Sequence, residues 1–201
     1  MYCYYIIMSN MDTRKIIQAL DYLAYRQPER TIDNMKAYKL LWLVDRFHIR
    51  QYGRTVSGDE YHALPYGVVP SDAKCILEQQ KTKLKNSPAE VEKYIEILPE
   101  HRYRAKEEPN MRVFSESDIE ALDTILEHFN KYSALKLSGL SHTFPEWEHY
   151  KKSLEDHQKK NGYKINMNLF FENKKEDSGL FVDSPELLEQ TKAVYQQYQG
   201  Y

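Results

Sequence analysis

The strongest hydrophobic pattern of the chain lies between residues 39 and 53. Apolar side chains recur there at helical spacing and also cover most of the other helix faces: Leu40, Leu41, Trp42, Leu43, Val44, Phe47 and Ile49. A helix that is apolar on nearly every side is normally buried among other elements. Thr31 or Asp33 can begin this helix, and Gly53 can end it as a C-cap. We therefore predict a buried central helix with Leu40, Leu41, Trp42, Val44 and Phe47 in the core, together with Trp147.

Apolar stripes and capping residues predict further helices on both sides of the central one. They begin near Thr13, Pro70, Ser115, Ser133, Pro145 and Ser184. The sequence at 115–118 fits a capping box, and a clear stripe follows it from Ile119 to Phe129. The third helix, which begins at Pro70, is expected to reach about residue 84. Alternation of Ile165, Met167, Leu169 and Phe171 favours a strand or an extended covering arm.

Residues 86–112 have a different character, typical of a small β element. A β-prone run at 94–98 precedes Pro99 and a second run at 101–105, which predicts a hairpin. We predict a mainly α fold of the α+β kind. It is a single helical domain around the buried central helix, with an antiparallel β-hairpin insertion at about 90–112. Residues 1–10 are interpreted as an N-terminal extension and 11–201 as the domain.

Composition and charge limit the classes of partner. The net charge is −2 and the pI is about 6.4, so there is no overall basic field to attract nucleic acid. Lysines cluster at 81–85 and 151–164, but acidic residues interrupt the second cluster, which is typical of a solvated face. No apolar run is long enough for a membrane span. The two cysteines fit a reduced, cytoplasmic protein. Homo-oligomerisation stays open.

Three residues could in principle support catalysis: Asp45, His48 and His142. Asp45 and His48 lie three positions apart and project from the same side of the central helix, as an imidazole and its orienting carboxylate would. No nucleophile motif accompanies them. We therefore favour a structural polar network of Asp45, Arg46, His48 and His142 that pins the loop after the central helix, and we expect no catalytic residue.

The histidines of the second half also raise the question of a metal site. His142, His149 and His157 lie seven and eight residues apart, with Glu146 and Glu148 between them. Histidines two helical turns apart are about 10 Å from each other, too far to hold one ion alone. We expect neither a metal nor a cofactor.

Aromatic and charged side chains of the loops are the candidates for contact with a protein partner. Tyrosine is unusually frequent, with seventeen in the chain. Tyrosine and arginine are enriched in protein interfaces. We expect Tyr61 and Tyr66 in the loop after the central helix, and Arg102 and Tyr103 in the hairpin, to be exposed and to bind a partner.

The stretch 39–70 has a motif that resembles the Panacea domain, the SocA-like antitoxin family. The matching positions are Lys39, Leu40, Leu41, Leu43, Asp45, His48, Gly53, Gly58, Asp59, Tyr61, Ala63, Gly67, Val69 and Pro70. A second family-like piece contains His142 and Trp147. The resemblance implies a mostly helical protein that neutralises a co-encoded toxin by direct contact in a bacterial or phage toxin–antitoxin system, and no enzyme. The alternatives are a small hydrolase-like enzyme centred on Asp45, His48 and His142, or a phage or mobile-element regulatory protein.

Overall fold

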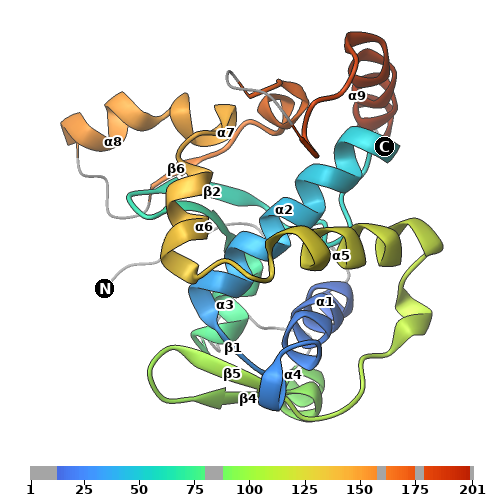
Figure 1. Ribbon diagram of the computed structural model, residues 1–201, viewed down its shortest axis with the longest axis vertical. Coiled ribbons are helices and arrows are strands. Elements are labelled where there is room, and N and C mark those ends of the chain that lie inside the picture. Colours follow the sequence, from blue (N-terminus) through green and yellow to red (C-terminus); the bar gives the residue numbers. More distant parts are fainter. Residues whose placement is uncertain (1–12, 80–87, 158–161, 175–178, 200–201) are drawn as a thin grey trace.

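The computed structural model describes residues 13–79, 88–157, 162–174 and 179–199. The central helix α2 (Asn34–Tyr52) runs diagonally through the middle of the molecule (Figure 1). The Asp33 side chain caps its start by accepting from the N–H of Lys36, and Gly53 ends it in the left-handed conformation. The predicted bounds of this helix are therefore confirmed. The expected N-terminal extension at 1–10 and the lysines at 81–85 lie outside the described residues.

Helices on several sides bury α2. It packs against α1 (Thr13–Tyr25), α5 (Glu116–Phe129), α6 (Ala134–Ser141) and α9 (Pro185–Gln199) (Figure 1). Leu40, Leu41, Trp42 and Val44 are fully buried, and Trp147 is buried with them. Phe47 was expected in the core but is only partly buried, since it packs at the margin of the cluster. The capping box predicted at the start of α5 is present.

One small antiparallel sheet has the strand order β1 (Thr31–Asp33), β5 (Arg102–Ala105), β4 (Ile95–Leu98). The predicted hairpin β4–β5 is therefore present, but β1 extends it and α1 packs against β5. Tyr103 pairs with Ile32 on one side and with Ile97 on the other. The hairpin is thus part of the folded body. Short elements flank it: η1 (Pro28–Arg30), α4 (Pro88–Tyr94) and η2 (Met111–Val113).

The second antiparallel sheet has the order β3 (Gly67–Pro70), β2 (Tyr61–Leu64), β6 (Tyr163–Lys164). β3 lies against α2 and leads into α3 (Ser71–Leu77), which ends well before the expected residue 84. The short helices α7 (Pro145–Glu148) and α8 (Lys151–His157) follow α6. Together these elements confirm a mainly helical fold with a small β component.

The segment after β6 departs from the sequence prediction. Residues Met167–Phe171 form the 3-10 helix η3, whereas the alternation of apolar residues favoured a strand or an extended arm. The physical reason lies in its backbone, whose Phe170 and Glu172 carbonyls accept hydrogen bonds from arginines of α2. Those bonds curl the segment over α2. No helix in the described part of the chain is long and apolar enough to cross a membrane.

Candidate functional site

Asp45 fastens the loop that follows α2. It is fully buried, and one carboxylate oxygen accepts hydrogen bonds from the N–H groups of Val56 and Ser57, both at 2.8 Å. The other oxygen accepts from the Ser57 hydroxyl and, at 2.7 Å, from the Tyr61 hydroxyl. Burial raises the pKa of Asp45, and these hydrogen bonds oppose that rise. Both oxygens are therefore engaged in holding the loop.

Asp59, further along the same loop, holds the start of α3. This buried carboxylate accepts from the N–H of Asp72 at 2.9 Å and from that of Ala73 at 2.8 Å, in the first turn of α3. Those N–H groups have no partner within the helix. Burial, and then the nearby Asp72 carboxylate, raise the pKa of Asp59 well above its usual range. The residues Gly58, Asp59 and Tyr61 thus connect α2 to α3.

Arg46 points to a different neighbour and forms a buried ion pair with Glu146 of α7. Its Nη1 lies 2.9 and 2.7 Å from the two carboxylate oxygens, and the Trp42 indole donates to the same carboxylate at 2.9 Å. Burial lowers the pKa of Arg46 to about 10 and raises that of Glu146. Removing either partner of a buried pair of this kind strongly destabilises the fold, because the other charge is left without compensation. It fixes α7 on α2.

His48 faces α5. Its Nδ1 lies 2.7 Å from the Arg54 carbonyl oxygen, so Nδ1 must carry the proton that is donated. Nε2 then accepts from the Ser117 hydroxyl at 3.0 Å, beside Asp118 at 3.3 Å. Burial lowers the pKa of His48 and favours this neutral form. Asp118 is bound instead by Lys15 at 2.7 Å and Arg54 at 2.8 Å.

The β2–β3 turn is held by α6 and α7. Trp147 donates from its indole to the Leu64 carbonyl at 2.8 Å, and Ser138 donates to the Tyr66 carbonyl at 2.8 Å. The His142 ring stacks on Trp147, with centroids 3.9 Å apart. Burial, and then the charge of Lys39, lower the pKa of His142.

Lys39 lies beneath the same turn. It is buried, and its Nζ donates to the Val68 carbonyl at 2.6 Å. Burial lowers the pKa of this ammonium to about 7. Gly67 passes so close that an added Cβ would lie 2.9 Å from Lys39 Nζ and 1.9 Å from Ser141 Oγ. Lys39, Ser141 and Gly67 are thus packed into one tight contact.

The expected network of Asp45, Arg46, His48 and His142 is correct only in part. Asp45 and His48 both bind the loop after α2, and His48 also binds α5. Arg46 binds α7 and His142 stacks on Trp147, so these two do not hold that loop together with Asp45. The reason is geometric, because positions 45, 46 and 48 leave α2 in different directions and meet different neighbours. Each side chain holds a contact of the scaffold, and the structure does not assemble the catalytic trio of Asp45, His48 and His142.

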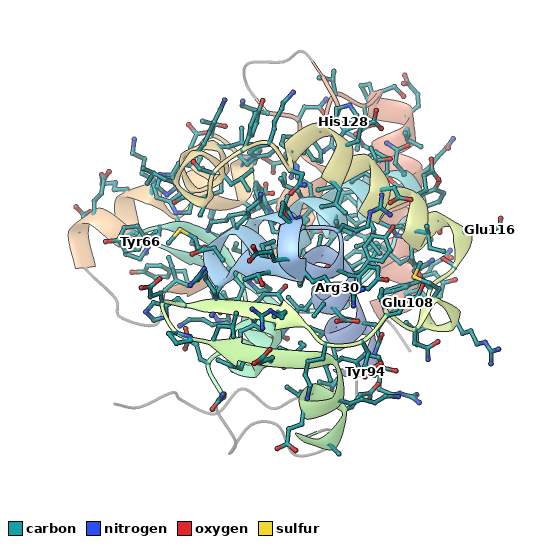
Figure 2. The ribbon with its side chains drawn as sticks, turned by 60° about the horizontal axis from the view of Figure 1, so that its bottom comes forward. Arg30, Tyr66, Tyr94, Glu108, Glu116 and His128 are labelled. Atoms are coloured by element: carbon teal, nitrogen blue, oxygen red, sulfur yellow. The ribbon has the colours of Figure 1, made fainter. Side chains whose placement is uncertain are left out.

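The candidates for partner contact divide into two groups. Tyr66 is 68% exposed, and Figure 2 places it at the edge of the molecule opposite Glu116. Arg102 is exposed on β5. The expected exposure of Tyr61 and Tyr103 is wrong, since they are 1% and 0% exposed. Tyr103 faces α1 and donates to the Leu20 carbonyl at 2.9 Å, because alternate residues of β5 point inward.

The residues considered for a metal site also contact different neighbours. His142 stacks on Trp147, His149 packs against Tyr150, and Glu146 is bound to Arg46. Among the residues placed by the structure, no group of three or more His, Cys, Asp or Glu side chains could hold an ion. The burial of the Glu146 carboxylate is therefore explained by its ion pair with Arg46.

The scaffold residues Asp45, Asp59 and Lys39 lie within the span of a family match. The family model described as "Antitoxin SocA-like, Panacea domain" matches residues 38–148, more than half of the chain. The chain belongs to this family. Comparison with curated proteins and with solved structures gives no match. The matched span of the Panacea domain contains the loop held by Asp45, the α3 cap at Asp59 and the turn above Lys39.

Sequence reasoning missed Arg50, which holds the segment that follows the matched span. It is fully buried, and its guanidinium donates to Asp183 at 2.6 Å and to the carbonyls of Phe170, Glu172 and Phe181 at 2.9–3.0 Å. Nothing in the local sequence reveals this role, because an arginine in the last turn of a helix is also favourable for the helix dipole. Its partners lie more than a hundred residues away in the sequence.

Proposed function

We propose that this Panacea domain is the antitoxin of a bacterial or phage toxin–antitoxin system. It binds a co-encoded toxin directly and blocks the action of that toxin in the bacterial cytoplasm. The family match supports an antitoxin. The observation that supports binding, without turnover, is the use of the acidic side chains in the matched span. Asp45, Asp59 and Glu146 are buried and hydrogen-bonded within the fold. The motif therefore builds a rigid scaffold that can present its loops to a partner.

The hydrolase-like alternative receives less support from the geometry. A general base needs a free nitrogen or carboxylate oxygen within reach of the substrate. Both ring nitrogens of His48 are occupied, by the Arg54 carbonyl and the Ser117 hydroxyl. Asp45 is fully buried beneath its loop. Direct recognition of nucleic acid is not part of the proposal, because the net charge is −2.

The proposed contact surface includes exposed side chains on two turns. Tyr66 is at the tip of the β2–β3 turn, and Arg102 is on the β4–β5 hairpin. The motif residues Lys39 and Trp147 hold the β2–β3 turn, and β1 and α1 hold the hairpin. A large ring on a rigid turn loses little conformational freedom on binding, which favours affinity. Most of the central helix is buried, so it offers less surface than these two turns.

Co-expression tests the proposal. The gene next to the one encoding this chain is expressed alone and together with it, and growth and co-purification are measured. We expect the neighbour to stop growth alone, and the pair to grow normally and to purify as a stable complex. The antitoxin assignment is contradicted if the neighbouring protein is harmless alone. It is also contradicted if that protein is toxic but this chain neither binds it nor neutralises it.

A matched pair of tyrosines tests the contact surface. Tyr66 and Tyr198 are 68% and 69% exposed, and Tyr198 lies on α9, outside the family span. Tyr66→Ala should weaken toxin binding about tenfold or more, as truncation of an interface anchor does. Tyr198→Ala should leave affinity unchanged. Equal affinities for the two variants in a titration calorimeter would contradict the assignment of Tyr66.

A further inference from the structure

The solvent side of α6 carries exposed apolar side chains next to the β2–β3 turn (Figure 1). Leu135 of α6 is 78% exposed, and Tyr66 of the turn is 68% exposed. Ser138, one helical turn after Leu135, donates to the Tyr66 carbonyl at 2.8 Å, so the turn lies alongside this part of the helix. We call Tyr66, Leu135, Gly139, Lys131 and Lys136 the α6 surface.

Gly139 lies one turn after Leu135 on the same side of α6. An added Cβ there would have no heavy atom within 4 Å in the described part of the chain. Glycine is unfavourable in a helix interior, because it loses the most conformational freedom on folding. The described fold gains nothing from the small residue, whereas another molecule can come close to a backbone that carries no side chain. The position therefore indicates a close approach from outside.

The chain segments around the α6 surface contain lysines and no carboxylates. These segments are residues 34–44 in α2, 61–70 in the β2–β3 hairpin and 128–145 around α6. Together they contain no Asp or Glu, and their lysines are Lys36, Lys39, Lys131 and Lys136. The chain as a whole has a net charge of −2. A positive region on a net negative protein favours a partner that is acidic at the point of contact.

The lysine head groups lie at the edge of the α6 surface. The Nζ atoms of Lys131 and Lys136 are 5.8 and 3.9 Å from the centroid of the Tyr132 ring. The Nζ of Lys36 donates to the Asn130 carbonyl at 2.7 Å and brings a third positive charge to the same loop. An exposed contact between a cation and a ring is weak, so it leaves the ammonium groups available to a carboxylate.

We propose that the α6 surface binds an acidic segment of the toxin, in which a large apolar side chain is flanked by aspartate or glutamate. The apolar side chain would pack on Leu135 and Tyr66 above Gly139, and the carboxylates would pair with Lys131 and Lys136. An apolar centre with a charged rim is the usual composition of a protein interface. The inference rests on the proposed antitoxin function, and it specifies the chemistry of the toxin at that contact.

Filling the space at Gly139 is the sharpest test. Gly139→Gln places a long side chain on the surface and also favours the helix. We expect this variant to have a higher Tm than the wild type and yet to bind the co-encoded toxin at least about tenfold more weakly in titration calorimetry. Gly139→Ala should also raise the Tm but weaken binding much less, because a methyl group leaves most of the space open. Undiminished affinity of Gly139→Gln overturns the proposal.

A charge reversal tests the rim independently of Gly139. Lys131→Glu with Lys136→Glu should weaken binding at least about tenfold and reduce the dependence of affinity on salt. The helix tolerates the change, because Ser133 caps α6 and glutamate is favoured three residues after such a cap. Lys93→Glu with Lys192→Glu, on α4 and α9, changes the net charge equally and should alter neither quantity. Equal effects of the two pairs reject a local acidic contact.

Two further measurements separate the toxin from other occupants of the α6 surface. Sedimentation of the chain alone should give the same oligomeric state for the wild type and for Gly139→Gln, and a dimer that this substitution dissociates overturns the proposal in favour of a second copy. Duplex DNA that the wild type binds and the lysine variant does not overturns it in favour of nucleic acid.

The wild-type chain separates this inference from the proposed function. A co-encoded neighbour that the wild type does not bind overturns both. Wild-type binding that Gly139→Gln and the lysine variant both retain overturns the α6 surface alone and leaves the antitoxin function standing.

Discussion

Asp45 and Asp21 are both fully buried aspartates, but their surroundings differ. Asp45 accepts from two N–H groups and two hydroxyls. Asp21 lies on α1 and, within the described chain, has no hydrogen-bond partner for either carboxylate oxygen. Burial raises the pKa of Asp21 to about 7, although the charge of Arg30 opposes that rise and Glu107 adds to it. Asp21 is therefore expected to be protonated below neutral pH.

This difference predicts how stability depends on pH. A raised pKa in the folded state means that the contribution of Asp21 is fully present below about pH 4 and is lost as pH rises through about 7. Asp21→Asn keeps a neutral side chain at every pH. We expect its free energy of unfolding to exceed that of the wild type by about 1–3 kcal/mol at pH 8, and the difference to vanish near pH 4.

Urea unfolding at the two pH values measures the effect. Asp156→Asn is the control, because Asp156 is exposed on α8. An Asp21→Asn variant that gains nothing at pH 8 would show that the carboxylate is solvated or paired.

At the scale of single elements, the β2–β3 hairpin shows how the motif builds a rigid turn. Its residues 64–67 are held from below by Lys39 and from the side by α6 and α7. Gly67 has a φ of +96° and no room for a side chain against Ser141. Gly139 of α6 has open space around it. Close approach thus requires glycine at position 67, whereas nothing in the described contacts requires it at position 139.

Alanine substitutions separate the two glycines. Gly67→Ala should lower the free energy of unfolding by at least about 2 kcal/mol, through strain at positive φ and the clash with Ser141. Gly139→Ala should raise it by about 0.5–1 kcal/mol, because alanine is favoured in a helix interior. Adding Ser141→Ala to Gly67→Ala should recover part of the loss by removing the nearest atom. Identical melting curves for the two single variants would be inconsistent with this packing.

At the scale of the whole molecule, α2 connects the family region to the C-terminal part of the chain. Arg46 donates to the Glu172 carbonyl, and Arg50 donates to three carbonyls and to two side chains, those of Asp183 and Asn173. The planar guanidinium with its five donors fits this arrangement, and an ammonium does not. α9 is therefore attached to the core chiefly through α2, whereas the η3 segment lies against both α2 and α7.

Arg50→Lys preserves the charge but loses most of these bonds. We expect a loss of about 2–4 kcal/mol in the free energy of unfolding, since several buried carbonyls are left without donors. We also expect faster proteolysis of the chain after residue 172, measured by limited digestion and mass spectrometry. Arg112→Lys, at an exposed arginine, is the control. A digestion pattern shared by both variants would mean that Arg50 does not hold this segment.

The sequence by itself determined the features that depend on local signals. The bounds of α2, the capping box of α5 and the β4–β5 hairpin follow from side chains within a few residues of each element. The motif at 39–70 likewise identified the family that the comparison confirms. Short-range propensity, capping and periodicity act within one element, so they can be read without knowing its neighbours.

Only the tertiary structure decided which way the amphipathic side chains face and what they bind. Tyr61 and Tyr103 can be anchors on a surface or donors in a core, and the choice depends on Asp45 and on the Leu20 carbonyl. The alternation at 165–171 gave way to a 3-10 helix, whose Phe170 carbonyl binds Arg50 and whose following Glu172 carbonyl binds Arg46. The partners of these groups are 16 to 126 positions away along the chain. Contacts at such separations form only when the elements pack, which is why no local pattern contains them.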